Sequence, residues 1–235
     1  MKYMGSKNRI AKYILPIMLK AAEDKGFTTW VEPFVGGANL IDKVPSRFKR
    51  IGYDLNPHTI AALIAIRDMV DQLPDSFTFE QRKFYKEQPV SPLTSWACIV
   101  TSFGADLKGG YAREKGSDDT TFVGYGKRNA QKQSPNLQGV ELVNQSYDTI
   151  VLQEPSLIYC DPPYQGTTGY KTGAFLHDKF FDWCRQKKEE GHIVFVSEYS
   201  APEDFEVIWQ GEIKTNFASQ RNAATHKAVE KLFKV

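Results

Sequence analysis

The sequence predicts an α/β protein built on a mostly parallel sheet of about seven strands with an antiparallel edge strand. Three observations predict this class. Short apolar runs alternate with helix-length amphipathic stretches on both sides of an irregular middle region, and the tail holds closely spaced strand-like runs. Two of the apolar runs also end abruptly, at Gly36-Gly37 and at Asp161-Pro162-Pro163. Strands that alternate with helices form parallel sheets, whereas strands joined by short turns pair antiparallel.

The individual elements follow from local patterns. Ser6 is placed to cap a helix that continues to about Ala22, and Pro16 should kink or split that helix. Asn56 and Pro57 are typical of the cap and first turn of a helix that follows the second strand. Five strands are expected before the tail, at Trp30–Val35, Ile51–Leu55, Gly139–Asn144, Ser156–Cys160 and His192–Ser197, with a further helix around Leu176–Glu190. The tail supplies two or three more strands, at Glu206–Trp209, Ile213–Phe217 and Ala228–Val235.

The middle of the chain interrupts this pattern. From about Asp75 to Pro135 the regular alternation breaks down, so we expect residues 75–135 to be an insertion. The catalytic domain would then consist of residues 1–74 and 136–235. Within the insertion, residues 104–132 contain six glycines and six basic against four acidic residues.

Composition narrows the class of protein. The formal net charge of +2 neither requires nor excludes a nucleic-acid partner. The first residues lack the apolar segment of a signal peptide, and the apolar run Ile60–Ile66 is too short to cross a bilayer. The three cysteines are widely spaced, which suits neither a disulfide framework nor a zinc site. We therefore expect a cytoplasmic protein with no metal and no membrane partner.

The sharpest chemical signal is Asp161-Pro162-Pro163-Tyr164, which directly follows the apolar run Leu157–Cys160. Ligands of open α/β sheets bind beyond the carboxyl ends of the strands, where this segment is expected. The prolines fix the backbone and remove two donors, so acceptor oxygens remain for an amino group, and Tyr164 offers a flat face to the ring bearing it. The alternative is a proline-stiffened turn that starts at an aspartate.

A second signal lies at the ends of the first two strands. Glu32–Asn39 contains Gly36-Gly37, but it is neither a dinucleotide fingerprint nor a phosphate-binding loop. Asp54 ends the next strand, where an acidic residue can hold the two hydroxyls of a ribose. The alternative for Asp54 is helix capping, shared with Asn56. A ribose carboxylate without a phosphate loop suits an adenosine ligand that carries no phosphate.

With these motifs the chain resembles the Dam-type (D12 class, alpha group) adenine-specific DNA N6-methyltransferases over most of its length. Lys2–Lys7 looks like the amino-terminal cofactor motif, Glu32–Asn39 the glycine motif, Tyr53–Asn56 the ribose motif and Asp161–Tyr164 the catalytic motif. The sequence departs from the family pattern at Tyr3, where tryptophan is common, and at Ala38, which replaces the second glycine. The resemblance implies a Rossmann-like S-adenosylmethionine-dependent methyltransferase fold.

The resemblance also implies residue roles. S-adenosylmethionine would be contacted by residues from four motifs: Tyr3, Lys7, Glu32, Phe34, Gly36, Asp54, Asn56 and Asp161. Asp161, Pro162, Pro163 and Tyr164 would be catalytic, binding the target amine and stacking on its base. The contact to the cofactor adenine stays open between Gln145 and Ser146.

Double-stranded DNA is the implied partner, and the insertion stands where the family places target recognition. The candidate DNA-binding residues are Lys108, Arg113, Lys127, Arg128 and, more weakly, Arg221, because Lys and Arg bind phosphates and Arg reads base edges. The alternative for residues 104–132 is a solvated glycine-rich loop. We expect a monomeric, stand-alone methylase of the kind found in restriction–modification.

Three other functions remain open from the sequence. One is methylation of cytosine N4 in DNA, since that amine poses the same electronic problem. Another is methylation of RNA adenine or of a protein glutamine on the same fold. A third is a catalytically inactive nucleic-acid-binding module, although such a module would be expected to lack Asp161 or Asp54.

Overall fold

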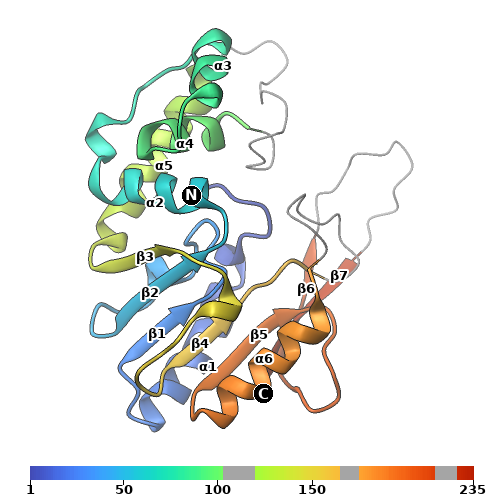
Figure 1. The fold of residues 1–235 in the computed structure, drawn as a ribbon. Coiled ribbons are helices and arrows are strands. Elements are labelled where there is room, and N and C mark those ends of the chain that lie inside the picture. The colour runs from blue at the N-terminus through green and yellow to red at the C-terminus, as the bar shows by residue number, and fades with distance from the viewer. Residues whose placement is uncertain (103–119, 165–174, 215–226) are drawn as a thin grey trace. The chain divides into compact units, whose positions relative to one another are not determined.

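The computed structural model describes residues 1–102, 120–164, 175–214 and 227–235. Its sheet has seven strands in the order β3-β2-β1-β4-β5-β7-β6 (Figure 1). The strands are β1 Thr29–Glu32, β2 Lys49–Asp54, β3 Val140–Asn144, β4 Leu157–Cys160, β5 Ile193–Glu198, β6 Glu206–Lys214 and β7 Lys227–Lys234. The helices are α1 Ala11–Asp24, α2 Pro57–Asp68, α3 Phe79–Glu87, α4 Pro92–Val100, α5 Thr120–Leu137 and α6 His177–Glu189.

The pairing of the strands confirms the predicted fold class. β2 pairs with β3, β1 with β4 and β4 with β5, all in parallel. β7 is antiparallel to both of its neighbours, β5 and β6. All residues of β1 and β4 are buried, as expected for central strands of a helix-covered sheet.

The chain divides into two compact units. The first comprises Met1–Lys12 with Phe34–Ile150, and the second comprises Tyr13–Pro33 with Val151–Val235. In the first unit, α2 packs against α4 and α5, and α3 packs against α4 (Figure 1). In the second unit, α6 packs against β5.

Three element predictions were wrong in detail. Of the kink or split expected at Pro16, the split does not occur, because α1 is continuous from Ala11 to Asp24 with Pro16 inside it. The two tail strands expected at 206–209 and 213–217 form one strand, β6, with an irregularity between Val207 and Trp209. The first strand ends at Glu32 rather than at Val35.

The stretch between Asp75 and Pro135 contains helices, where the sequence showed only a loss of alternation. Capping boxes begin two of them: Thr78 with Gln81 at α3, and Ser91 with Thr94 at α4. No described helix is long and apolar enough to cross a membrane.

Candidate functional site

In the first unit, Asp54 holds two backbone segments together. One carboxylate oxygen, Oδ2, accepts the Gly36 N–H at 3.1 Å, and the other, Oδ1, accepts the Asn56 N–H at 2.8 Å. Burial raises the pKa of Asp54 to about 6, although both N–H groups oppose the rise. This carboxylate therefore links the loop after β1 to the start of α2.

The glycine loop is shaped by close contacts with Tyr3. A Cβ added to Gly36, whose φ is 48°, would lie 3.0 Å from the Tyr3 ring, and one added to Gly37 would lie 2.7 Å from the Tyr3 Cβ. Ala38 has a φ of 55°, which is the left-handed conformation that a glycine adopts most easily. Replacement of the second glycine by Ala38 thus leaves the loop in a glycine-like conformation.

Gln133, on α5, holds the same loop from the other side. Its Nε2 donates to the carbonyls of Gly37 at 3.0 Å and Ala38 at 3.2 Å, and to Asp42 Oδ2 at 3.0 Å. The residue is 6% exposed. No local sequence pattern marks this contact, so Gln133 was not among the residues expected near the loop.

Phe34 and Tyr147 form an aromatic pair, with ring centroids 5.3 Å apart and planes inclined at 34°. Tyr147 begins the short 3-10 turn Tyr147–Thr149 after β3. The two predicted adenine contacts are engaged elsewhere: the Gln145 side chain donates to the Thr149 carbonyl at 2.8 Å, and Ser146 Oγ donates to Asp148. Tyr147 is therefore a further candidate to contact the adenine of the cofactor. The sequence offered one indication of this, because Tyr147 is an aromatic residue that directly follows Gln145 and Ser146.

Two other predicted cofactor residues have local roles in the structure. The Lys7 ammonium, on a side chain that is largely buried, donates to the Gly5 carbonyl at 2.9 Å. Asn56 Oδ1 accepts the His58 N–H at 3.0 Å, which confirms it as the N-cap of α2.

In the second unit, Asp161-Pro162-Pro163-Tyr164 directly follows β4. The strand order reverses between β1 and β4, which are parallel neighbours with Val31 opposite Ile158. Glu32 is the last residue of β1, which pairs with β4. Its side chain is 3% exposed and accepts the Trp30 indole N–H at 3.0 Å. The segment therefore lies where open α/β sheets bind ligands.

The Tyr164 side chain contacts a carboxylate and a neighbouring ring. Its hydroxyl donates to Glu230 Oε1 at 2.7 Å, and its ring makes a T-shaped contact with the ring of Tyr199, with centroids 4.7 Å apart. Burial, and then the charges of Asp161 and Glu230, raise the pKa of Tyr164 well above its ordinary value. The Cys160 thiol is fully buried, and burial raises its pKa as well, so it remains protonated within the sheet.

Two of the five candidate DNA-binding residues, Lys127 and Arg128, lie in the described part of the chain. Lys108, Arg113 and Arg221 lie outside the described residues. On α5, Lys127 Nζ forms an ion pair with Asp75 Oδ1 at 2.9 Å, and the exposed Arg128 lies over the ring of Tyr125 at 4.5 Å. Within the described ranges, no group of three or more His, Cys, Asp or Glu residues is arranged to hold a metal ion.

Comparison with known proteins places the chain in a family. The family of D12 class N6 adenine-specific DNA methyltransferases matches residues 3–90 and 102–222. Among solved structures, the chain is similar to a candidate methylase from Haemophilus influenzae, HI0767, with 10% identity, a TM-score of 0.39 and coverage of 98% of this chain and 90% of the other. It is also similar to SMU.472, a candidate methyltransferase complexed with SAH, with 10% identity, a TM-score of 0.37 and coverage of 98% and 52%. No curated protein matches the sequence.

Proposed function

Because the chain belongs to the D12 class of N6 adenine-specific DNA methyltransferases, we propose that it transfers a methyl group from S-adenosylmethionine to the N6 amino group of adenine in double-stranded DNA. The observation that carries the proposal is the position of Asp161-Pro162-Pro163-Tyr164 at the end of buried β4, where the strand order reverses.

The residues of the first unit fit an adenosine ligand without phosphates. Asp54 supplies a carboxylate for two ribose hydroxyls, and the pair of Phe34 with Tyr147 supplies an aromatic surface for a base. Tyr3 and Gly36 line the same loop. When bound, S-adenosylmethionine supplies an electrophilic methyl group on a positively charged sulfur.

The residues of the second unit act on the target base. The adenine amino nitrogen is a poor nucleophile because its lone pair is delocalised into the ring. The Asp161 carboxylate and the Pro162 carbonyl would accept its two N–H groups, which localises the lone pair and leaves Asp161 as acceptor for the proton that is released. Tyr164 would replace the stacking that the base loses when it leaves the duplex. No covalent step is required of Cys160, which is buried and protonated.

The test is a labelled-methyl assay with DNA, RNA and protein in parallel, followed by digestion of the DNA to nucleosides. We expect label in N6-methyladenine and none in N4-methylcytosine. Label confined to cytosine, RNA or protein would contradict the proposed substrate.

The change Asp161→Ala should lower methyl transfer by about 10²–10³-fold, the usual effect of losing one group that stabilises the transition state. Asp24→Ala is a matched control, because Asp24 is exposed and bonded only locally, to Lys20 at 2.7 Å. Binding of S-adenosylhomocysteine, measured by calorimetry, should change far less in Asp161→Ala than turnover does. Normal turnover by this variant would remove Asp161 from the mechanism.

A further inference from the structure

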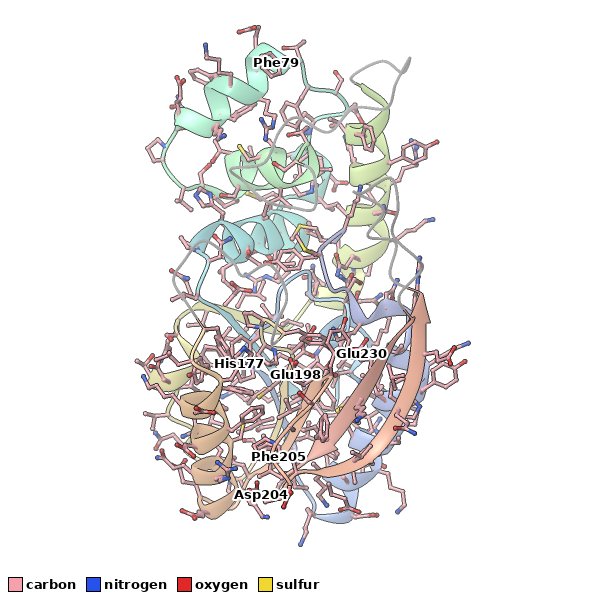
Figure 2. All side chains as sticks on the ribbon, turned by 90° about the vertical axis from the view of Figure 1, so that its right-hand side faces the viewer. Phe79, His177, Glu198, Asp204, Phe205 and Glu230 are labelled. Atoms are coloured by element: carbon pink, nitrogen blue, oxygen red, sulfur yellow. The ribbon has the colours of Figure 1, made fainter. Side chains whose placement is uncertain are left out.

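The proposed mechanism leaves unexplained a buried carboxylate on β7. Glu230 is 3% exposed, and a buried carboxylate is costly unless polar partners surround it. Its Oε1 accepts the hydroxyl hydrogen of Tyr164 at 2.7 Å. Figure 2 shows Glu230 on β7 and Glu198 on the neighbouring strand β5. Glu230 thus comes from a strand of the sheet, and its carboxylate accepts a hydrogen bond from Tyr164, the last residue of the Asp-Pro-Pro-Tyr segment.

The geometry around Tyr164 restricts its ring. Glu198, the last residue of β5, pairs with Lys231 in the antiparallel register of β5 and β7, so Tyr199 follows the strand at the level of Glu230. The Tyr199 ring meets the Tyr164 ring at 83°. The hydrogen bond to Glu230 fixes one end of the tyrosine, this contact fixes its side, and the preceding prolines limit the backbone.

We propose that Glu230 is a positioning residue for methyl transfer, which holds the ring of Tyr164 in the plane on which the target base stacks. This proposal rests on the proposed function, since it assigns Tyr164 to the target base. A ring fixed before the base arrives loses no freedom on binding, and such preorganisation favours the reactive arrangement. The Tyr164 hydroxyl stays a donor throughout the neutral pH range, because burial and the nearby carboxylates raise its pKa.

Glu230 has two alternative roles that predict different results. It could serve only the stability of the sheet, in which case activity would follow thermal stability. It could instead act by its charge on the base, in which case any neutral residue would fail equally and Tyr164 would be irrelevant to its effect.

The experiment measures kcat and KM for DNA methylation in Tyr164→Phe, Glu230→Gln, Glu230→Asp, Glu230→Leu and the double variant Tyr164→Phe/Glu230→Leu. Losing a hydrogen bond to a charged acceptor costs about 10- to 100-fold, so we expect that decrease in kcat/KM for Tyr164→Phe and for Glu230→Leu. The double variant should be no worse than either single variant, because both remove the same bond. Glu230→Gln should retain activity within about threefold, because an amide oxygen still accepts the hydroxyl hydrogen.

The remaining variants separate position from charge. Glu230→Asp keeps the charge but shortens the side chain, so it should lose as much activity as Glu230→Leu. Glu206→Gln, at an exposed glutamate on the adjacent strand β6, is the matched control and should behave as wild type. The thermal midpoint and S-adenosylhomocysteine affinity are measured for every variant, and a target duplex with 2-aminopurine at the methylated position reports stacking of the base.

Additive losses in the double variant, full activity of Tyr164→Phe, or equal failure of Glu230→Gln and Glu230→Leu would overturn the proposal. So would losses that follow the thermal midpoint. If Glu230→Leu does not fold, Tyr164→Phe and Glu230→Gln still decide the matter. Absence of methyl transfer by the wild-type protein would instead reject the proposed function, and this proposal with it.

Discussion

Asp54 combines an observed structural role with a proposed role in ligand binding. Its oxygens accept the backbone N–H groups of Gly36 and Asn56, so the same carboxylate proposed to bind a ribose also shapes the glycine loop. From the sequence, Asp54 was expected either to bind a ribose or to share helix capping with Asn56, and its contact with the Asn56 N–H at the start of α2 supports the second role. The contact with Gly36 was not expected.

The raised pKa of Asp54 predicts a pH-dependent stability. Because the folded-state pKa of about 6 lies above the ordinary aspartate pKa of 3.8, the folded state binds more protons than the unfolded state between these two pH values. Stability from this group is therefore present below about pH 4 and is lost as pH rises to about 6, by up to about 3 kcal/mol. Asp54→Asn removes this dependence.

The measurement is the free energy of unfolding in denaturant at pH 4, 5, 6 and 7 without cofactor, for wild type and Asp54→Asn. The difference between the two proteins should shift in favour of the variant as pH rises. A difference that is constant over this range would show that Asp54 does not titrate as described.

Some residue-level features were open to prediction and others were not. Asn56 was predicted as a helix cap because capping depends on neighbours two residues away. The left-handed φ of Ala38 contradicts alanine's own preference, so only the surrounding loop contacts explain it. Tyr147 was missed because its partner, Phe34, lies on a different strand end.

Among the elements, α5 links the insertion to the glycine loop. It begins within the segment assigned to target recognition, and its Gln133 contacts Gly37, which lies 96 residues away in sequence. Contacts over such distances leave no trace in periodicity, which explains why strands and flanking helices were predicted and this link was not. The division of β6 into two strands had a different cause, since Gly211 reads as a turn residue but lies inside the strand.

Gln133→Met should test this link. Methionine fills similar space but donates no hydrogen bond, so the Gly37 and Ala38 carbonyls lose a donor in a buried setting. We expect a loss of about 1–3 kcal/mol in the free energy of unfolding and weaker binding of S-adenosylhomocysteine. Gln131→Met, at an exposed glutamine on the same helix, should change neither quantity. Equal behaviour of the two variants would show that the hydrogen bonds of Gln133 contribute nothing.

At the scale of the molecule, the mostly parallel sheet follows from an alternation of strands and helices that the sequence displays directly, whereas the order of the strands depends on their pairing. The candidate segment Asp161–Tyr164 was also open to prediction, because it is contiguous and ends a buried strand. The surroundings of the candidate DNA-binding residues were less predictable, since ion pairs such as that of Lys127 with Asp75 depend on how segments distant in sequence pack. Lys127 and Arg128 are neighbours in sequence, yet one is largely buried in an ion pair and the other is exposed on Tyr125.

This difference predicts unequal effects on DNA binding. Arg128→Ala should weaken binding and lower the slope of log affinity against log salt by about one, as expected for one lost phosphate contact. A base contact would instead relax preference at one position. Lys127→Ala should leave the salt slope nearly unchanged, because Asp75 already neutralises its charge. Binding titrations at several salt concentrations measure both, with Lys20→Ala as control. An unchanged slope in Arg128→Ala would move recognition elsewhere.

The place of β7 in the sheet determines when, during synthesis, this part of the sheet can form. β7 is the last of the seven strands to be synthesised, yet it lies between β5 and β6, which precede it. Until the ribosome has released residues 227–234, β5 and β6 lack the neighbour that joins them, and both expose unpaired edges to other nascent chains. Glu230 arrives with the same strand. A product that stops before residue 230 would therefore lack the hydrogen bond from Tyr164 to Glu230.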